Sequence, residues 1–224
     1  MTTRRQIDEL LRPYRQRKDL HVRGHEIYLV PIHHVTRGLR IYRTGEADRF
    51  DIALFVGLSF DPALGSPRAV SQVFRYENWL ARWTEPNLQQ HFERIIREYV
   101  LPSLRPLNLA TFAIEQDPLR QGPELPLEDA FELVHMKALL HTARGDFKAA
   151  AASLEVLTEI PRGHRVMEPV LSALLDHLRP LILANDRTAV AAMLHDWEAD
   201  SIGRWELSAH HERTPFPLEL QPQP

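Results

Sequence analysis

Histidine offers the most chemistry in this chain, because an imidazole ring binds metals and transfers protons near neutral pH. The 224-residue chain has 12 histidines, and the densest groups are His21 with His25, His33 with His34, and His210 with His211. Two imidazoles four residues apart meet on a helix, but the first of these pairs spans an expected entry into a strand. Neighbours in a strand point to opposite faces, so at most one member of the second pair can join a given site.

One enzymatic arrangement remains open. His33 or His34 with Asp51 or Glu26 from neighbouring strands could act as a general base or as metal ligands. This would make the protein a hydrolase or a metal-binding enzyme with its site between two modules. Structural or surface histidines are the favoured interpretation, since no HExxH helix is present. We therefore assign no catalytic, cofactor-binding or metal-binding residue, and we expect no cofactor.

Other catalytic motifs are missing from the sequence. Ser59 lies in Gly57-Leu58-Ser59-Phe60-Asp61, which is not the G-x-S-x-G turn of a serine hydrolase, and we place this serine in a strand. Neither G-x-G-x-x-G nor the phosphate-binding GxxxxGK[ST] loop occurs. The acidic pair Glu128-Asp129 falls at an expected helix start, where the helix dipole accounts for it.

Two groups of side chains could form binding surfaces. Trp79 and Trp83 are four residues apart and could form an exposed aromatic ridge, although core packing is favoured. Several basic side chains near the start of the chain could contact phosphates: Arg12, Arg15, Arg17, Lys18 and Arg23. They alternate with packing residues and include no aromatic ladder, so a solvated helix face is favoured and nucleic acid is not the expected partner.

Composition describes an ordinary globular protein, with 44% hydrophobic and 25% charged residues. The net charge of −3 is uneven: residues 1–60 carry 11 basic and 7 acidic groups, and the rest carry 16 and 23. The absence of cysteine excludes disulfides and thiolate metal sites, and together with the lack of an apolar signal or membrane-spanning run it favours the cytoplasm. Arginine supplies 24 of the 27 basic residues, which we associate with a GC-rich bacterial genome.

The first part of the chain predicts an N-terminal helix and a small antiparallel sheet. Apolar residues at helical spacing predict a helix over residues 4–18. Three β-prone runs follow at 26–35, 38–43 and 50–60, and the last has Phe50, Ile52, Leu54, Val56, Leu58 and Phe60 on one face. Beyond it, residues 69–76 could be a fourth strand or the beginning of a helix, and helix or irregular structure is favoured. Asn87 caps a helix to about Val100, and 107–114 is a β-prone run.

The second part predicts antiparallel helical hairpins after a proline-rich connection at 116–126. Helices are expected at about 127–143, 146–160, 166–184 and 187–200, with tight joints and N-caps at Gly145-Asp146 and Asn185-Asp186. The fold class is therefore α+β, with a module over 1–115, a mostly helical module over 124–210 and a flexible proline-rich tail over 214–224.

The segment Leu139–Pro161 resembles a tetratricopeptide helical hairpin. The resemblance rests on the spacing of Gly145, Phe147, Ala150, Leu154 and Leu157, followed by a proline. Residues 166–200 form at most a degenerate second hairpin, because they lack the glycine and alanine pattern. The resemblance covers about a tenth of the chain and implies a scaffold or protein-binding role.

Taken together, these patterns favour a non-enzymatic bacterial interaction module of the immunity or adaptor type. It would bind another protein through a composite surface of both modules, by shape and charge complementarity. The acidic C-terminal half would suit a basic partner. No membrane association is expected, and the patterns do not determine an oligomeric state.

Overall fold

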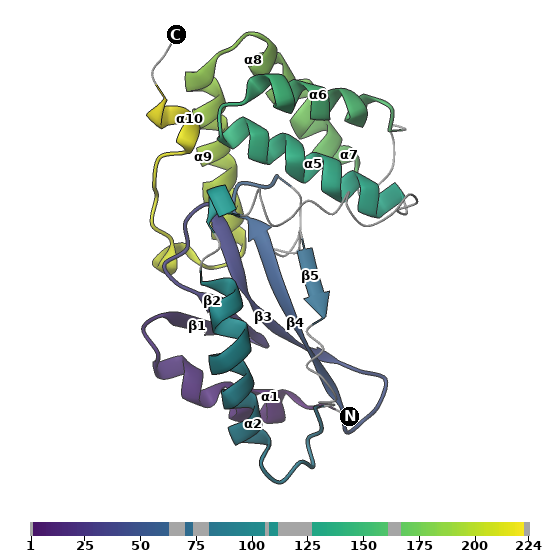
Figure 1. Ribbon diagram of the computed structural model, residues 1–224, viewed down its shortest axis with the longest axis vertical. Coiled ribbons are helices and arrows are strands. Elements are labelled where there is room, and N and C mark those ends of the chain that lie inside the picture. Colours follow the sequence, from purple (N-terminus) through teal and green to yellow (C-terminus); the bar gives the residue numbers. More distant parts are fainter. Residues whose placement is uncertain are drawn as a thin grey trace. The chain divides into compact units, whose positions relative to one another are not determined.

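The computed structural model describes residues 2–62, 70–73, 81–105, 108–111, 127–160 and 167–221, with the backbone alone at 70–73 and 127–130. It confirms the α+β fold, with an N-terminal helix, an antiparallel sheet and a mostly helical C-terminal half (Figure 1). The chain forms two compact units. The first contains the described residues of Met1–Gly57, Pro67–Leu107 and His210–Glu212, and the second those of Leu58–Ser66, Asn108–Ala209 and Arg213–Pro224.

The N-terminal helix is shorter than the 4–18 expected from its apolar spacing. Helix α1 spans Arg4–Leu11, and Thr3 caps it by accepting a hydrogen bond from the Gln6 N–H. A 3₁₀ segment, η1, continues over Arg12–Gln16. Pro13 has no N–H to donate to the carbonyl four residues back, so the α-helical ladder cannot continue through it. The predicted apolar side chains are nevertheless buried: Ile7, Leu10, Leu11 and Tyr14.

Five strands follow one another in both sequence and space. They are β1 (Leu20–Arg23), β2 (Glu26–Leu29), β3 (Val35–Arg43), β4 (Phe50–Leu58) and β5 (Val70–Val73). The pairs β1/β2, β2/β3 and β4/β5 are antiparallel. The tight turn between β1 and β2 needs a residue with positive φ, which Gly24 supplies at +58°.

Strand β4 has the alternation predicted from its sequence. Phe50, Ile52, Val56 and Leu58 are buried and Leu54 is partly buried, while Phe60 is buried just beyond the strand. The opposite face holds the buried Ala53 and Phe55 but also the exposed Asp51. The strand is therefore covered on both sides along most of its length.

A glycine allows β3 to approach β2 closely. A Cβ atom added at Gly38 would lie 2.0 Å from the Ile27 carbonyl oxygen and 2.6 Å from the Phe55 ring. A larger residue would therefore push the two strands apart.

Two predictions about the strands were wrong, and one strand was not predicted. Residues 70–73 form strand β5, not a helix or irregular structure, because they pair with Ala53–Val56 of β4. The described part of the 107–114 run is helical at 109–111, where the Asn108 side chain accepts from the N–H groups of Ala110 and Thr111. Strand β1 was not predicted: its sequence Leu-His-Val-Arg alternates apolar and polar residues, but four residues are too short a run for the period to stand out.

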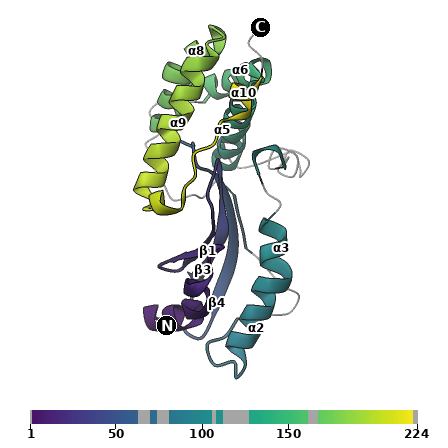
Figure 2. The same ribbon diagram turned by 90° about the vertical axis from the view of Figure 1, so that its left-hand side faces the viewer.

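A helix lies along one face of the sheet (Figure 2). It consists of α2 (Leu88–Ile95), a π-helical turn η2 (Ile96–Val100) and α3 (Leu101–Leu104). The predicted stop before Pro102 is wrong, because the widened π-turn carries the helix past the proline. Asn87 precedes the helix as predicted, but its side chain forms no capping hydrogen bond.

The second unit consists of helical hairpins. Helices α5 (Leu127–Ala143) and α6 (Phe147–Thr158) form the first. A segment of α7 (Glu168–Leu171), π-helical η4 (Ser172–Leu178) and α8 (Arg179–Leu183) forms the second with α9 (Arg187–Arg204). Among the described residues, no helix is long and apolar enough to cross a membrane.

The two hairpin joints use the same chemistry forty positions apart. Gly145 and Asn185 adopt positive φ, at +74° and +54°. Asp146 and Asp186 then cap the following helices, accepting from Ala149 N at 3.1 Å and Ala189 N at 2.9 Å. The second hairpin also carries alanines at Ala189, Ala191 and Ala192, so the view that it lacks the alanine pattern needs correction. Its glycine is replaced by asparagine, which tolerates the same backbone conformation.

The C-terminal segment differs from the flexible tail expected over 214–224. Residues 213–221 belong to the second unit, where they include the short helix α10 (Pro217–Leu220). Phe216 and Leu218 are buried, so these two side chains anchor a segment whose prolines suggested little packing.

Candidate functional site

The residues of the enzymatic hypothesis lie in the first unit, but they do not form one site. His33 and His34 lie in the connection between β2 and β3, where His33 Nδ1 is 3.1 Å from the Glu212 carbonyl oxygen. Asp51 is exposed on β4. Within the described ranges, no three histidine and acidic side chains are grouped in a way that could hold a metal ion.

Glu26 is part of a buried polar group. Arg40 Nε donates to its Oε1 at 2.5 Å, Arg40 Nη2 also contacts Oε1, and the Tyr28 hydroxyl donates to Oε2 at 2.5 Å. Burial and the neighbouring Glu26 charge raise the pKa of Tyr28. The carboxylate already receives hydrogen bonds at both oxygens, so its geometry is that of a structural ion pair.

Ser59 lies just beyond β4, not in the strand as expected. Its hydroxyl donates to Glu198 Oε1 at 2.5 Å, and Glu198 Oε2 is 3.7 Å from His195 Nδ1. All three residues are buried. In a serine hydrolase the imidazole lies between the serine and the acid, whereas here the carboxylate lies between the other two. The arrangement therefore joins β4's end to α9 within the second unit.

A second buried histidine joins the same two segments to α5. His135 Nε2 donates to Asp61 Oδ2 at 2.9 Å, and Ser201 Oγ donates to the Asp61 carbonyl at 3.1 Å. Burial disfavours the imidazolium, but the Asp61 charge, its hydrogen bond and the Glu132 charge together raise the pKa of His135.

This pair makes the stability of the second unit depend on pH. Because the folded-state pKa of His135 is raised, its stabilisation is complete below the unfolded pKa of about 6.5 and is lost as pH rises through the raised value. We expect the urea midpoint of the wild type to fall from pH 6 to pH 9 more than that of His135→Gln. Parallel midpoint profiles for the two proteins would contradict the assignment.

The C-terminal segment meets α9 through the buried Phe216 ring and the Glu219 carboxylate. The Phe216 ring lies edge-on to Phe60, with centroids 5.0 Å apart, and 4.7 Å from the His195 ring. Glu219 Oε2 accepts from the Phe216 N–H at 2.6 Å and from His195 Nε2 at 2.9 Å. The segment is therefore held in the second unit by an apolar contact at Phe216 and by polar contacts at Glu219.

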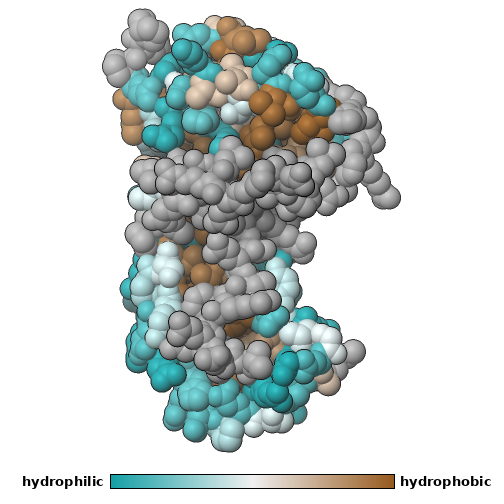
Figure 3. Space-filling model, turned by 45° about the vertical axis from the view of Figure 1, so that its right-hand side comes forward, coloured by the Kyte–Doolittle hydropathy of each residue, from teal (hydrophilic) through white to brown (hydrophobic). Residues whose placement is uncertain are grey.

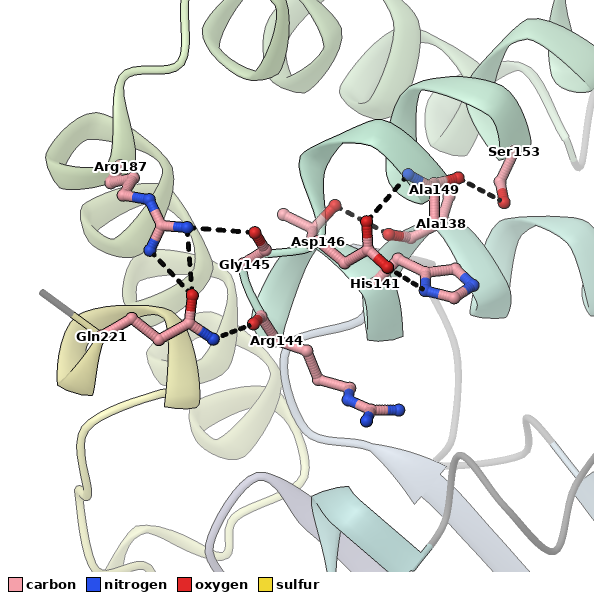
Figure 4. Close-up of polar contacts among 10 residues, drawn as sticks. Ala138, His141, Arg144, Gly145, Asp146, Ala149, Ser153, Arg187 and Gln221 are labelled. Carbon is pink, nitrogen blue, oxygen red and sulfur yellow. Dashed lines mark hydrogen bonds and ion pairs between the residues drawn. The ribbon is translucent and has the colours of Figure 1, made fainter. Parts of the chain in front are cut away.

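Arg187 connects this segment to the first hairpin joint, as Figure 4 shows. Its Nη2 donates to the Gly145 carbonyl at 3.1 Å, and both terminal nitrogens lie 3.1 Å from Gln221 Oε1. Gln221 Nε2 in turn donates to the Arg144 carbonyl at 2.8 Å. The guanidinium also lies over the Phe147 ring, 5.5 Å from its centroid.

A pocket of about 330 Å³ opens beside these contacts. Ala191 and Ala192 of α9 are small, so they leave room on the helix surface. The pocket is lined by Arg187, Thr188, Ala191, Ala192, His195, Arg213, Leu218, Glu219 and Gln221. The C-terminal segment thus supplies one wall of the pocket and α9 supplies the other.

The pocket is rich in positive charge that the described residues do not neutralise. The hydrogen bonds that Arg187 donates go to neutral carbonyl and amide oxygens. Arg213 has neither a hydrogen bond nor an ion pair with any described residue. The one lining carboxylate, Glu219, is held by His195 and the Phe216 N–H. Such a pocket favours a carboxylate or another anion.

The sequence did not single out these residues. The other candidates from the sequence do not line this pocket. Trp83 is partly buried and packs on Phe50, with ring centroids 4.3 Å apart. Trp79 and the side chains of Glu128 and Asp129 lie outside the described residues and side chains. Near the pocket, the sequence pattern identified only the N-cap Asp186, which marks the start of α9.

Comparison with known proteins adds no relationship to this geometry. Models of protein families, curated proteins and solved structures all gave no match to the chain.

Proposed function

We propose that the protein is a non-enzymatic bacterial interaction module of the immunity or adaptor type, which acts in the cytoplasm by binding another protein. The observation that carries the proposal is the docked C-terminal segment, with Phe216 and Leu218 buried in the helical unit. Beside the docked segment lies a pocket that two arginines line, Arg187 and Arg213. We place the partner's binding site at this pocket and call it the α9 pocket.

Charge gives the expected chemistry of the partner. Arg187 and Arg213 present guanidinium groups, which form paired hydrogen bonds with carboxylates. An acidic segment of the partner therefore suits the α9 pocket, whereas the net charge of the C-terminal half had suggested a basic partner. The local charge outweighs the net charge here, because screening in physiological salt limits charge effects to about 8 Å.

Two further features support protein binding. The hairpin of α5 and α6 buries Phe147, Ala150, Leu154 and Leu157, the residues on which the tetratricopeptide resemblance rests. On the face of the second unit visible in Figure 3, hydrophobic residues reach the surface among polar ones. Exposed large apolar side chains in the described ranges are Val156, Leu183 and Leu220.

Charge reversal in the α9 pocket tests the proposal. Arg213→Glu is expected to weaken partner capture from a host lysate on the order of tenfold, because it sets like charges against each other. Capture by the wild type should also fall as salt rises.

Lys148→Glu serves as the matched control, because Lys148 is exposed on α6 and does not line the pocket. It makes the same charge change and should leave capture within about twofold of the wild type. Equal recovery of the partner by both variants would refute a role for the α9 pocket, and failure to recover any specific protein would count against the interaction function.

A further inference from the structure

A separate pocket in the first unit gathers basic side chains from four segments. It measures about 360 Å³ and is lined by Arg15 of η1, Arg17 and Lys18 of the following turn, His21 of β1, and His210. The remaining lining residues are the aliphatic Leu20, Val22 and Val30. No carboxylate lines it among the described residues, and we call it the His21 pocket.

His210 reaches this pocket by backbone pairing far from its neighbours in sequence. Ile32 N donates to the His210 carbonyl at 2.8 Å, and Glu212 N donates to the Ile32 carbonyl at 2.9 Å. This parallel bridge places the His210 ring against that of His21, with centroids 4.0 Å apart. The backbone hydrogen bonds of this bridge therefore hold the two imidazoles together.

Positive charge around the rim exceeds the nearby negative charge. Arg15 pairs with Asp8 at 2.8 Å, and Asp19 receives both Arg17 and Arg105, at 2.7 and 2.8 Å. The hydrogen bond from Arg17 is the main reason that the pKa of Asp19 falls to about 2. These ion pairs are partly exposed, so each contributes little stability and an anion of higher charge can compete with it.

We propose that the His21 pocket binds a small phosphate monoester. Guanidinium, ammonium and imidazole groups all donate hydrogen bonds, and they reach the pocket from several directions. A tetrahedral dianion offers more acceptor oxygens to such a set than a planar carboxylate does. The aliphatic lining gives the organic part of the ester an apolar contact.

Binding is coupled to protonation of His21. In the absence of an anion, burial, His210 and Arg23 lower the pKa of His21, so the ring is neutral at pH 7. The groups around it are Arg15, Arg17 and Lys18 before β1, Arg23 on β1, Tyr28 on β2 and His210. A phosphate dianion in the pocket favours the imidazolium, so one proton is taken up as the ester binds.

Nuclear magnetic resonance titration of the full-length protein tests the proposal directly. With inorganic phosphate, we expect saturable shifts at Lys18 and His21 and a rise in the apparent pKa of His21. His177, exposed in the second unit, reports any general effect of ionic strength. Adenosine monophosphate should bind more tightly than phosphate, because its organic part contacts the aliphatic lining.

Matched variants separate the pocket from general attraction of anions. Lys18→Gln should weaken phosphate binding about tenfold, since it removes a charged hydrogen-bond donor. Arg12→Gln removes one charge from exposed η1 outside the pocket and should change the affinity less than about twofold. His21→Gln should abolish proton uptake while some binding remains.

Three results would overturn the proposal. They are the absence of saturable shifts with phosphate, equal weakening by Lys18→Gln and Arg12→Gln, and tighter binding of an oligonucleotide without terminal phosphate than of adenosine monophosphate. The last result would indicate a surface that follows a nucleic-acid backbone.

Discussion

Arg40→Met is expected to destabilise the first unit by about 3 to 5 kcal/mol, because it leaves the buried Glu26 carboxylate without its cation. Arg40 and Glu26 are both nearly inaccessible to water, with exposed fractions of 5% and 6%. In this variant the Tyr28 hydroxyl would still donate a hydrogen bond to Glu26. Amide hydrogen exchange of Leu39 and Ile41 on β3 would measure the loss, since their exchange reports unfolding of this unit alone.

A double variant distinguishes a lost ion pair from a packing defect. Glu26→Gln with Arg40→Met removes both charges, so it should recover part of the stability that Arg40→Met loses. The free energies of the two single changes should therefore not add. Additive losses would show that packing around these side chains, and not the buried charge, determines the effect.

Phe216→Ala should cost about 3 to 5 kcal/mol of local stability in the C-terminal segment, because it leaves a cavity against Phe60 and His195. The segment supplies Leu218, Glu219 and Gln221 to the α9 pocket, so partner binding should fall together with stability. Amide exchange of residues 216–221 and partner capture would be measured on the same variant.

Leu220→Ala is the control for this change. Leu220 lies on the same short helix but is 70% exposed, so its truncation should alter stability by less than about 0.5 kcal/mol. If Phe216→Ala left the exchange of this segment unchanged, the segment would not be anchored through the aromatic ring.

Local signals explain which parts of the fold could be predicted. The two-residue period of β4 is visible in the sequence because alternate side chains of a strand point to opposite faces, and Asp146 and Asp186 cap their helices through contacts three residues away. The period and the caps depend on neighbours in sequence. A strand at β5 was considered but not favoured, because its identity as a strand depends on pairing with β4.

Neither pocket could be predicted as a whole from the sequence, because each joins distant segments. The sequence did single out Arg15, Arg17 and Lys18 as possible phosphate contacts, but not their meeting with His210. Arg187 contacts Gly145 and Gln221, which lie far from it on either side in the chain. His210 meets His21 only through the bridge between Ile32 and His211. The prolines of residues 214–224 suggested a flexible tail, but burial of Phe216 depends on a ring from the other end of the second unit's sequence, Phe60.

Site-specific photo-crosslinking tests the α9 pocket most directly. A photoreactive residue would replace Ala192, which lines the pocket, and in a second protein Ala152, the exposed alanine at the corresponding position of the first hairpin. In host cells, position 192 should form a cross-link to one acidic protein that Arg213→Glu removes, and position 152 should not. Identical cross-links at both positions, or a product at 192 that persists with Arg213→Glu, would contradict the assignment of this pocket as the partner's binding site.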